Sequence, residues 1–255
     1  MISRIRNLYI SLVYLFLYLP LLLLVVYSFN EGRNPYGWQG FSFKWYAKLF
    51  DNDALLQSAG HSLLLAFSSA TATTVIGALT ALALHRYQFR GKSLLSGFLF
   101  TLMMVPDIVL AISLLLLFIW LGIHLGYISL LLSHITFSLP FVVVTVYARL
   151  VSFNEQVVEA ARDLGASESQ MVRTVLLPIL APALLAGWLL GFTLSLDDVV
   201  ISTFVTGPTF DVLPLRIYSM VRLGLKPEVN ALATLMLAVS LITLVTSHWL
   251  TRNRT

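Results

Sequence analysis

The 255-residue chain is 58% apolar and only 11% charged, and its mean hydropathy is +0.86. Soluble domains carry about 25% charged residues, so this composition indicates an integral membrane protein. The net charge is +4, but the basic residues stand at the ends of apolar segments, which excludes a nucleic-acid-binding patch. The chain has 0 cysteines, which excludes disulfide frameworks, thiolate nucleophiles and cysteine-based metal sites.

Six stretches are apolar and long enough to cross a bilayer, which takes about 20 helical residues. Because backbone amides in lipid must be hydrogen-bonded within their own segment, each stretch is predicted to be a helix. The fold class is therefore an all-α integral membrane protein with six transmembrane helices. The predicted spans are Leu8–Phe29, His61–Leu84, Leu94–Leu121, Ile128–Ala148, Ile179–Thr203 and Ala231–Leu250.

The first and third spans carry further signals. Arg4 and Arg6 precede the first span as in a signal peptide, but this apolar run is longer than a signal peptide's and no small-residue cleavage site follows it. We therefore expect an uncleaved anchor. Pro106 lies inside the third span and predicts a kink or tilt there.

The basic residues predict the orientation of the chain in the membrane. With the N-terminus inside, the cytoplasmic segments hold 10 lysines and arginines and the outer segments hold 6. Three of the ten, Arg86, Arg90 and Lys92, crowd one very short loop. Positive charge is retained on the cytoplasmic side, so both termini are predicted to be cytoplasmic.

The long connections suggest how the chain is organised. Residues 1–60 are predicted to hold the anchor helix and an aromatic-rich outer segment, and residues 61–250 to form the core domain. Residues 204–230 form a second outer connection with turn signals and a short amphipathic stretch. Residues 151–178 form the long inner connection.

The inner connection has the pattern of a helix–turn–helix. Asn154 is a helix N-cap residue followed by Glu155 in the first turn, and Gly165 is placed to end that helix. Ser167 with Gln170 three residues later forms a capping-box pattern that opens a second helix through Leu176. Pro178 then marks the beginning of the next span. An amphipathic helix resting on the membrane surface is the alternative explanation of this pattern.

One motif in this connection resembles a known signature. Glu159-Ala160-Ala161, then Gly165, then Leu177-Pro178 is similar to the EAA motif of binding-protein-dependent ABC importer permeases, the type I, MetI-like family. The resemblance implies that this helix is a coupling helix, which docks in a groove of the ATP-binding subunit. The small side chains of Ala160 and Ala161 allow close approach to a partner, and Glu159 can make a charge-assisted hydrogen bond across the contact.

Three acidic residues lie inside the predicted spans. Asp107 follows Pro106 in the third span, and Asp197 and Asp198 lie deep in the fifth. A carboxylate in a span costs several kcal/mol unless it faces a polar cavity or has a partner. No Lys or Arg lies in any predicted span, so we expect no counter-charge within the chain, and a path that attracts cations is the functional interpretation.

Several alternatives remain open for these acids. They could lie near the outer interface, cap a broken helix or pair with a base on a partner subunit, and for Asp107 these explanations have equal weight with the functional one. Small and polar residues form a stripe along one face of the fifth span, through Gly191, Ser195, Asp198 and Ser202. His134 is expected to satisfy a polar contact near the fourth span.

A second resemblance extends nearly end to end. Residues 41–46, 107–115, 134–146, 187–200 and 227–234 are similar to permeases of the polyamine-import family. The resemblance implies an importer of spermidine or putrescine in the bacterial inner membrane, with acidic residues such as Asp197 and Asp198 binding the amines. The choice between these two aspartates stays open.

The same resemblance implies the partners. Two related permease subunits would form the channel, a dimer of ATP-binding cassette subunits would drive it, and a periplasmic polyamine-binding protein would deliver the substrate, all surrounded by membrane lipid. The chain itself is expected to be neither an enzyme nor a binder of a cofactor.

Other functions fit these features less well. An ABC importer permease for another cationic or small substrate is the main alternative, but an anion carrier such as a sulfate importer should show basic residues in its spans. An intramembrane hydrolase would need two acids facing one another, which adjacent Asp197 and Asp198 do not provide. A secondary transporter would leave the EAA-like segment without a role.

Overall fold

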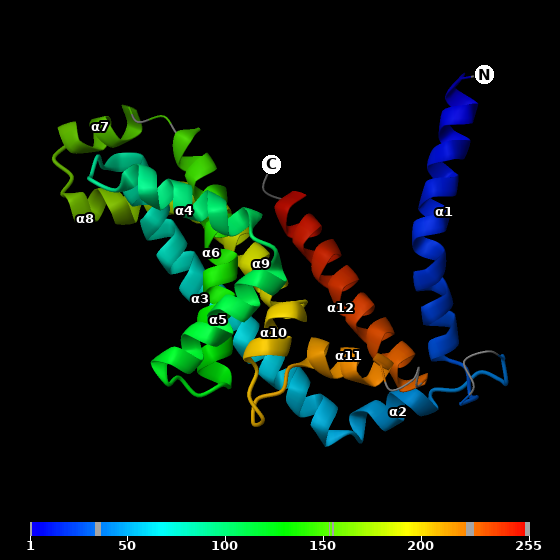
Figure 1. Ribbon diagram of the computed structural model, residues 1–255. Coiled ribbons are helices and arrows are strands. Elements are labelled where there is room, and N and C mark those ends of the chain that lie inside the picture. The colour runs from blue at the N-terminus through cyan, green and yellow to red at the C-terminus, as the bar shows by residue number, and fades with distance from the viewer. Residues whose placement is uncertain (1, 34–36, 153, 155, 223–226, 253–255) are drawn as a thin grey trace. The chain divides into compact units, whose positions relative to one another are not determined.

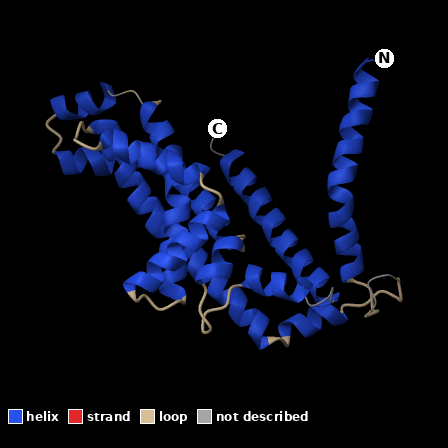
Figure 2. Ribbon diagram, viewed as in Figure 1, coloured by secondary structure: helices blue, strands red, loops and turns tan. Residues whose placement is uncertain are grey.

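The computed structural model describes residues 2–33, 37–152, 154, 156–222 and 227–252, and the fold is helical throughout these residues (Figures 1 and 2). The first seven elements are α1 (Ile2–Ser28), α2 (Lys44–Phe50), α3 (Asp53–Arg86), α4 (Lys92–Met104), α5 (Asp107–Leu121), α6 (Tyr127–Val151) and α7 (Gln156–Asp163). The others are α8 (Glu168–Met171), the π-helical turn η1 (Val172–Leu176), α9 (Leu177–Leu196), α10 (Val200–Val205), α11 (Leu213–Arg222) and α12 (Pro227–Arg252).

The chain forms two compact units. One comprises residues 1–57 with 216–255, and the other comprises residues 58–215. The predicted organisation into an anchor segment, residues 1–60, and a core domain, residues 61–250, stays a prediction.

In the first unit, α12 contacts both α1 and α2. The side chains of Lys48 on α2 and Glu228 on α12 form an ion pair. The segment between α1 and α2 is anchored by Trp45, which is buried and donates a hydrogen bond from Nε1 to the Asn30 carbonyl at 2.7 Å. Most described side chains of α1 are exposed and apolar, which suits a helix surrounded by lipid or by another subunit.

In the second unit, α9 packs closely on α6 because glycines face Val142. A Cβ atom at Gly77 or at Gly187 would lie 3.0 or 3.1 Å from Val142 Cγ1, closer than ordinary contact. Gly191 meets the same valine and Ala70 on α3. Small residues therefore allow α3, α6 and α9 to approach one another, as the Gly187-x-x-x-Gly191 spacing predicts.

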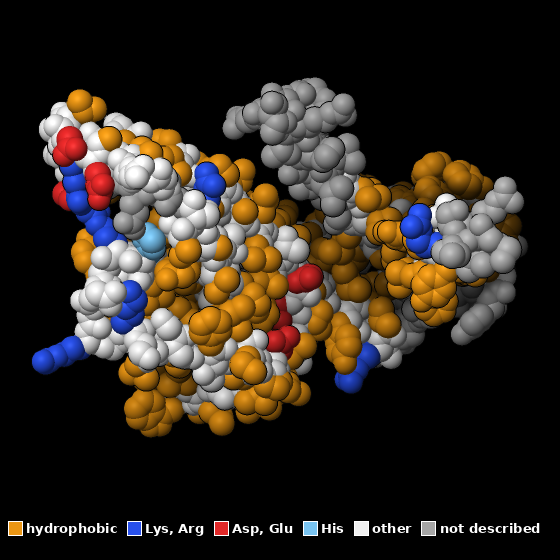
Figure 3. Space-filling view, turned by 90° about the horizontal axis from the view of Figure 1, so that it is seen from above, with side chains coloured by type: hydrophobic (Ala, Val, Ile, Leu, Met, Phe, Trp, Pro, Cys, Tyr) orange, Lys and Arg blue, Asp and Glu red, His pale blue; other side chains and the backbone are white. Residues whose placement is uncertain are grey.

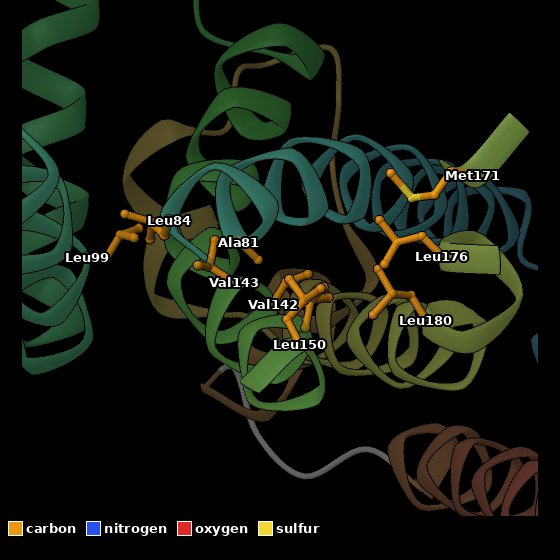
Figure 4. Close-up of a cluster of buried hydrophobic side chains, with 10 residues drawn as sticks. Ala81, Leu84, Leu99, Val142, Val143, Leu150, Met171, Leu176 and Leu180 are labelled. Atoms are coloured by element: carbon orange, nitrogen blue, oxygen red, sulfur yellow. The ribbon is translucent and has the colours of Figure 1, made fainter. Parts of the chain in front are cut away.

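Two apolar clusters fill this unit. The first, shown in Figure 4, joins α3, α4 and α6 to η1 and α9 and contains Ala81, Leu84, Leu99, Val142, Val143, Val146, Leu150, Met171, Leu176 and Leu180. The second joins α5, α6 and α10 and includes Leu110, Leu130, Ile201 and Val205. Figure 3 shows that hydrophobic side chains also cover much of the surface it presents, as expected of a protein surrounded by lipid.

Four helical segments of the described chain are long and apolar enough to cross a membrane: Arg6–Ser28, Asp53–Arg86, Tyr127–Val151 and Glu168–Leu196. The third predicted span is instead divided into α4 and α5, and the helix direction bends by 115° between them. Pro106 explains the break, because proline lacks the N–H that would continue the helix and holds the preceding Val105 in an extended conformation. The kink predicted at Pro106 is confirmed, in the form of a full break.

The sixth predicted span falls within α12. Its side chains at residues 239 and 240 and from residue 242 onward lie outside the described part of the chain. The described residues thus provide four spans, or five if the bent pair counts as one, and six spans with cytoplasmic termini stay a prediction.

The helix that opens at Glu168 does not end before Pro178, contrary to the sequence prediction. It continues through η1 into α9 without interruption. Pro178 has no N–H to donate to the carbonyl four residues before it. The π-helical turn just before Pro178 changes the hydrogen-bond spacing there, so the helix continues past the proline.

Candidate functional site

The fifth predicted span is broken at the two aspartates. The helix α9 ends at Leu196 and α10 begins at Val200, so residues 197–199 are not helical. The prediction of one continuous span over Ile179–Thr203 is wrong in this respect. One of the alternatives left open for these acids, that an acid caps a broken helix, matches the observed geometry.

Asp198 provides that cap. Its Oδ1 accepts a hydrogen bond from the backbone N–H of Ile201 at 3.1 Å, and its Oδ2 accepts one from the N–H of Ser202 at 2.8 Å. The Ser202 hydroxyl also donates to Oδ2 at 2.9 Å. A carboxylate that takes the orphan N–H groups of a first helical turn stabilises that turn.

His134 joins this cap to the neighbouring helices. It projects from α6, is 2% exposed, and lies with Nδ1 2.7 Å from Ser195 Oγ on α9 and Nε2 3.3 Å from Ser202 Oγ on α10. Its Nε2 is also 3.5 Å from Asp198 Oδ2. The polar contact predicted for His134 is confirmed, and three members of the predicted polar stripe converge on it.

This cluster gives Asp198 a polar neighbour and not a permanent counter-charge, because a histidine is charged only when it is protonated. His134 comes from α6, 64 positions away in sequence, at a spacing that no local pattern reveals.

Asp197 and Asp107 are both more exposed than Asp198. Asp197 is the C-cap residue of α9 and its side chain is exposed. Asp107 is the first residue of α5, directly after the break at Pro106, and it is exposed as well. Neither carboxylate forms an ion pair with another described side chain, so both present negative charge at a helix break.

The inner connection forms the predicted helix–turn–helix. The Asn154 Oδ1 accepts from the N–H of Gln156 at 3.0 Å, just before α7. Gly165 ends α7 with φ +82°, a left-handed conformation that favours glycine, and the Ala166 N–H donates to the Ala161 carbonyl at 3.0 Å. The capping box of Ser167 and Gln170 is also present. The cap predictions for Asn154, Gly165 and Ser167 are confirmed, whereas Glu155 lies outside the described residues.

The surface of α7 is only partly covered. Ala161 is half-buried and packs against the cluster of Figure 4, whereas Glu159, Ala160 and Gly165 are exposed. Leu164 is 90% exposed. An apolar side chain so far out in solvent, beside small residues and an acid, suits contact with a partner.

Glu168 connects the hairpin formed by α7 and α8 to the end of α3. Its carboxylate accepts from Arg86 Nη2 at 3.0 Å to each oxygen and from Arg162 Nη2 at 2.7 Å. Arg86 is the last residue of α3 and Arg162 belongs to α7, so one acid holds three elements together. The sequence does not predict this contact, because Arg86 and Glu168 are 82 positions apart and meet only through the packing of the helices.

Comparison with known proteins identifies the family of the chain. Residues 73–252 match the model of the family described as "Binding-protein-dependent transport system inner membrane component". The chain belongs to this family. The matched residues include the α9–α10 break and the whole of the α7–α8 hairpin.

The chain is also similar over nearly its full length to individual transport proteins. It is 57% identical over 256 residues to the spermidine/putrescine transport system permease protein PotC of Escherichia coli (strain K12), covering 100% of this chain and 97% of that protein. It is 40% identical to the putrescine transport system permease protein PotI of the same strain, covering 93% and 87%. The chain is therefore a multi-pass membrane protein of the transport-permease class.

The fold of this inner membrane component also occurs among solved structures. The crystal structure of a bacterial ABC transporter involved in the import of the acidic polysaccharide alginate matches with a TM-score of 0.77, 16% identity and coverage of 97% of this chain and 96% of that chain. At this identity the similarity concerns the fold alone. Within the described residues, no group of three or more His, Cys, Asp or Glu is placed to hold a metal ion.

Proposed function

We propose that the chain is a membrane-spanning permease subunit of an ATP-driven importer of spermidine and putrescine, and that it forms half of the translocation channel. The observation that carries this proposal is full-length identity of 57% to PotC, with 40% to PotI, because both of these proteins are named for polyamine transport. Polyamines are flexible cations, and the helix breaks of this chain present acids.

The three acids have distinct roles in this proposal. Asp197 contacts an amine of the substrate, since its carboxylate is exposed and lies at a non-helical segment. Asp107 contributes a second negative charge at the α4–α5 break. Asp198 lies beside the path and holds the α9–α10 break in shape, because its oxygens are already engaged by backbone and hydroxyl donors.

The packing of α5 on α10 supports a common path for Asp107 and Asp197. Leu110, one turn after Asp107, belongs to the same buried cluster as Ile201 of α10. The two acids thus begin or precede helices that contact each other. Two breaks in neighbouring helices expose backbone polar groups, which membrane proteins tolerate where the backbone lines a water-filled cavity.

The hairpin provides the coupling to ATP hydrolysis. Glu159, Ala160, Ala161 and Gly165 form the helix and turn that dock against an ATP-binding cassette subunit, with Leu164 as an apolar contact. Glu168 makes α7 move together with the end of α3 and with α9. Movement driven by nucleotide therefore reaches the helix that carries Asp197.

The assembly and location follow from the same proposal. The partners are a dimer of ATP-binding subunits, a second homologous permease subunit and a periplasmic polyamine-binding protein, in the bacterial inner membrane with both termini cytoplasmic. ATP hydrolysis belongs to the partner subunit, and this chain performs transport without a cofactor.

The experiment is uptake of radiolabelled spermidine by cells that lack their own polyamine importers and express this chain with the partner subunits of its transporter. We expect uptake that needs this chain and that unlabelled spermidine or putrescine competes away. Glu159→Lys should abolish uptake while the chain still reaches the membrane. Uptake of a different cation without competition by polyamines would support the alternative substrate class and contradict the proposal.

A further inference from the structure

A cavity of about 190 Å³ opens between α3, α4 and α6, within the unit formed by residues 58–215. Its wall is mostly apolar. The residues that matter here are Leu84, Lys92, Ser96, Leu99, Phe100 and Tyr147. An apolar cavity of about 150 Å³ already stays dry and accepts a benzene molecule, so this one is large enough for a section of hydrocarbon.

One end of the cavity is charged. Lys92 is half-buried at the first residue of α4, and its Nζ donates to the Tyr87 carbonyl at 3.2 Å. Among the described residues, no carboxylate pairs with this ammonium group within 4 Å. A cation without a counter-charge at the edge of an apolar cavity attracts an anion to that end of the cavity.

The beginning of α4 adds to this positive potential. Its N-cap is Gly91, which has no side chain to accept a hydrogen bond from the first-turn N–H groups. The N-terminal end of a helix carries a partial positive charge, so a lysine there raises the local potential further. Both features favour an anion at the same end of the cavity.

One face of α4 leads from this charged end into the apolar part. Lys92, Ser96 and Phe100 are spaced four residues apart and line the cavity in order. Leu99 and Leu84 close the inner wall as members of the buried cluster in Figure 4. Phe100 is 63% exposed, so the cavity opens at the surface of this unit and not into its core.

We propose that this cavity binds an anionic phospholipid, with an acyl chain against the apolar wall and the phosphate paired with Lys92. The combination of an uncompensated cation, a helix N-terminus and an adjoining apolar surface matches an amphiphilic anion. Basic pockets between membrane helices on the cytoplasmic side are suited to such headgroups. A soluble anion such as free phosphate would leave the apolar wall unoccupied.

Native mass spectrometry of the full chain in neutral detergent tests the site. The probes are dioleoylphosphatidylglycerol and dioleoylphosphatidylcholine, which share acyl chains and differ in headgroup charge. We expect Lys92→Gln to weaken phosphatidylglycerol binding roughly fivefold, the factor that one surface cation contributes toward an anionic lipid. Lys92→Arg should restore binding, phosphatidylcholine binding should not change, and excess inorganic phosphate should not compete.

Two further variants make the outcome specific. Arg90→Gln removes a charge from the same loop without touching the cavity and should bind like the wild type. Ser96→Phe fills the cavity and should weaken binding of both lipids. Equal binding by wild type and Lys92→Gln, or equal losses for Lys92→Gln and Arg90→Gln, would overturn the proposal. Absence of lipid on the wild type would overturn it too.

Discussion

Two adjacent aspartates have unequal surroundings at the α9–α10 break. The carboxylate of Asp198 accepts three hydrogen bonds and lies 3.5 Å from His134 Nε2, whereas Asp197 is exposed. Hydrogen bonds to a charged acceptor contribute about 1.5–3 kcal/mol each. One residue of the pair therefore supports the structure, and the other is free to bind.

A stability measurement separates these two roles. Asp198→Asn should lower the free energy of unfolding by about 1–3 kcal/mol, since an amide cannot accept on both sides of the cap. Asp197→Asn should leave it within about 0.5 kcal/mol of the wild type, as for other exposed positions. Thermal unfolding of the purified chain in one detergent checks both. Equal melting temperatures for the two variants would contradict the structural role of Asp198.

At the scale of elements, the turn between α7 and α8 depends on Gly165. Its φ of +82° is accessible to glycine and, with less cost than for other residues, to asparagine. Gly165→Ala should destabilise the turn by about 1–2 kcal/mol and reduce coupled transport, while Gly165→Asn should retain most of it. Spermidine uptake, corrected for the amount of chain in the membrane, measures the difference. Full transport by the alanine variant would show that the turn is not needed in this geometry.

The link through Glu168 gives a second prediction for the hairpin. Exposed ion pairs contribute only about 0–1 kcal/mol to stability, so Glu168→Gln should leave the fold intact. It should nevertheless raise ATP hydrolysis relative to spermidine transported in the reconstituted complex, because α7 could move without α3 and α9. Asp163→Asn is the matched control, an exposed acid on α7 with no ion pair among the described residues. If both variants keep the wild-type ratio, the link does not transmit movement.

Short-range features of these elements could be predicted from the sequence, and long-range ones could not. The Ser167–Gln170 capping box and the Gly165 turn depend on residues within three or four positions, and both are present. Hydropathy averages over a window, so it joined α9 and α10 into one span and could not register the break at residues 197–199. The partnership of His134 with Asp198 depends on how α6 packs against α9, which no single segment encodes.

For the whole molecule, the sequence predicts six spans, and the part of the chain that the structure describes provides four long apolar segments and one bent pair. The chain has 0 cysteines, so single cysteines can report its topology without a background signal. Cysteines introduced at Asn7, Gln170 and Arg252 should be labelled only from the cytoplasmic side by a membrane-impermeant maleimide. One at Thr209 should be labelled from the opposite side. Labelling of Arg252→Cys and Thr209→Cys from the same side would contradict the six-span topology.

The most direct measurement of the proposed mechanism is spermidine uptake at sub-saturating concentration by Asp197→Asn, Asp197→Glu and the wild type, with equal amounts of chain in the membrane. Loss of one charged contact to the substrate should reduce uptake by Asp197→Asn about tenfold or more, and Asp197→Glu should recover much of it. Undiminished uptake by Asp197→Asn would contradict the assignment of this exposed carboxylate to the amine of the substrate.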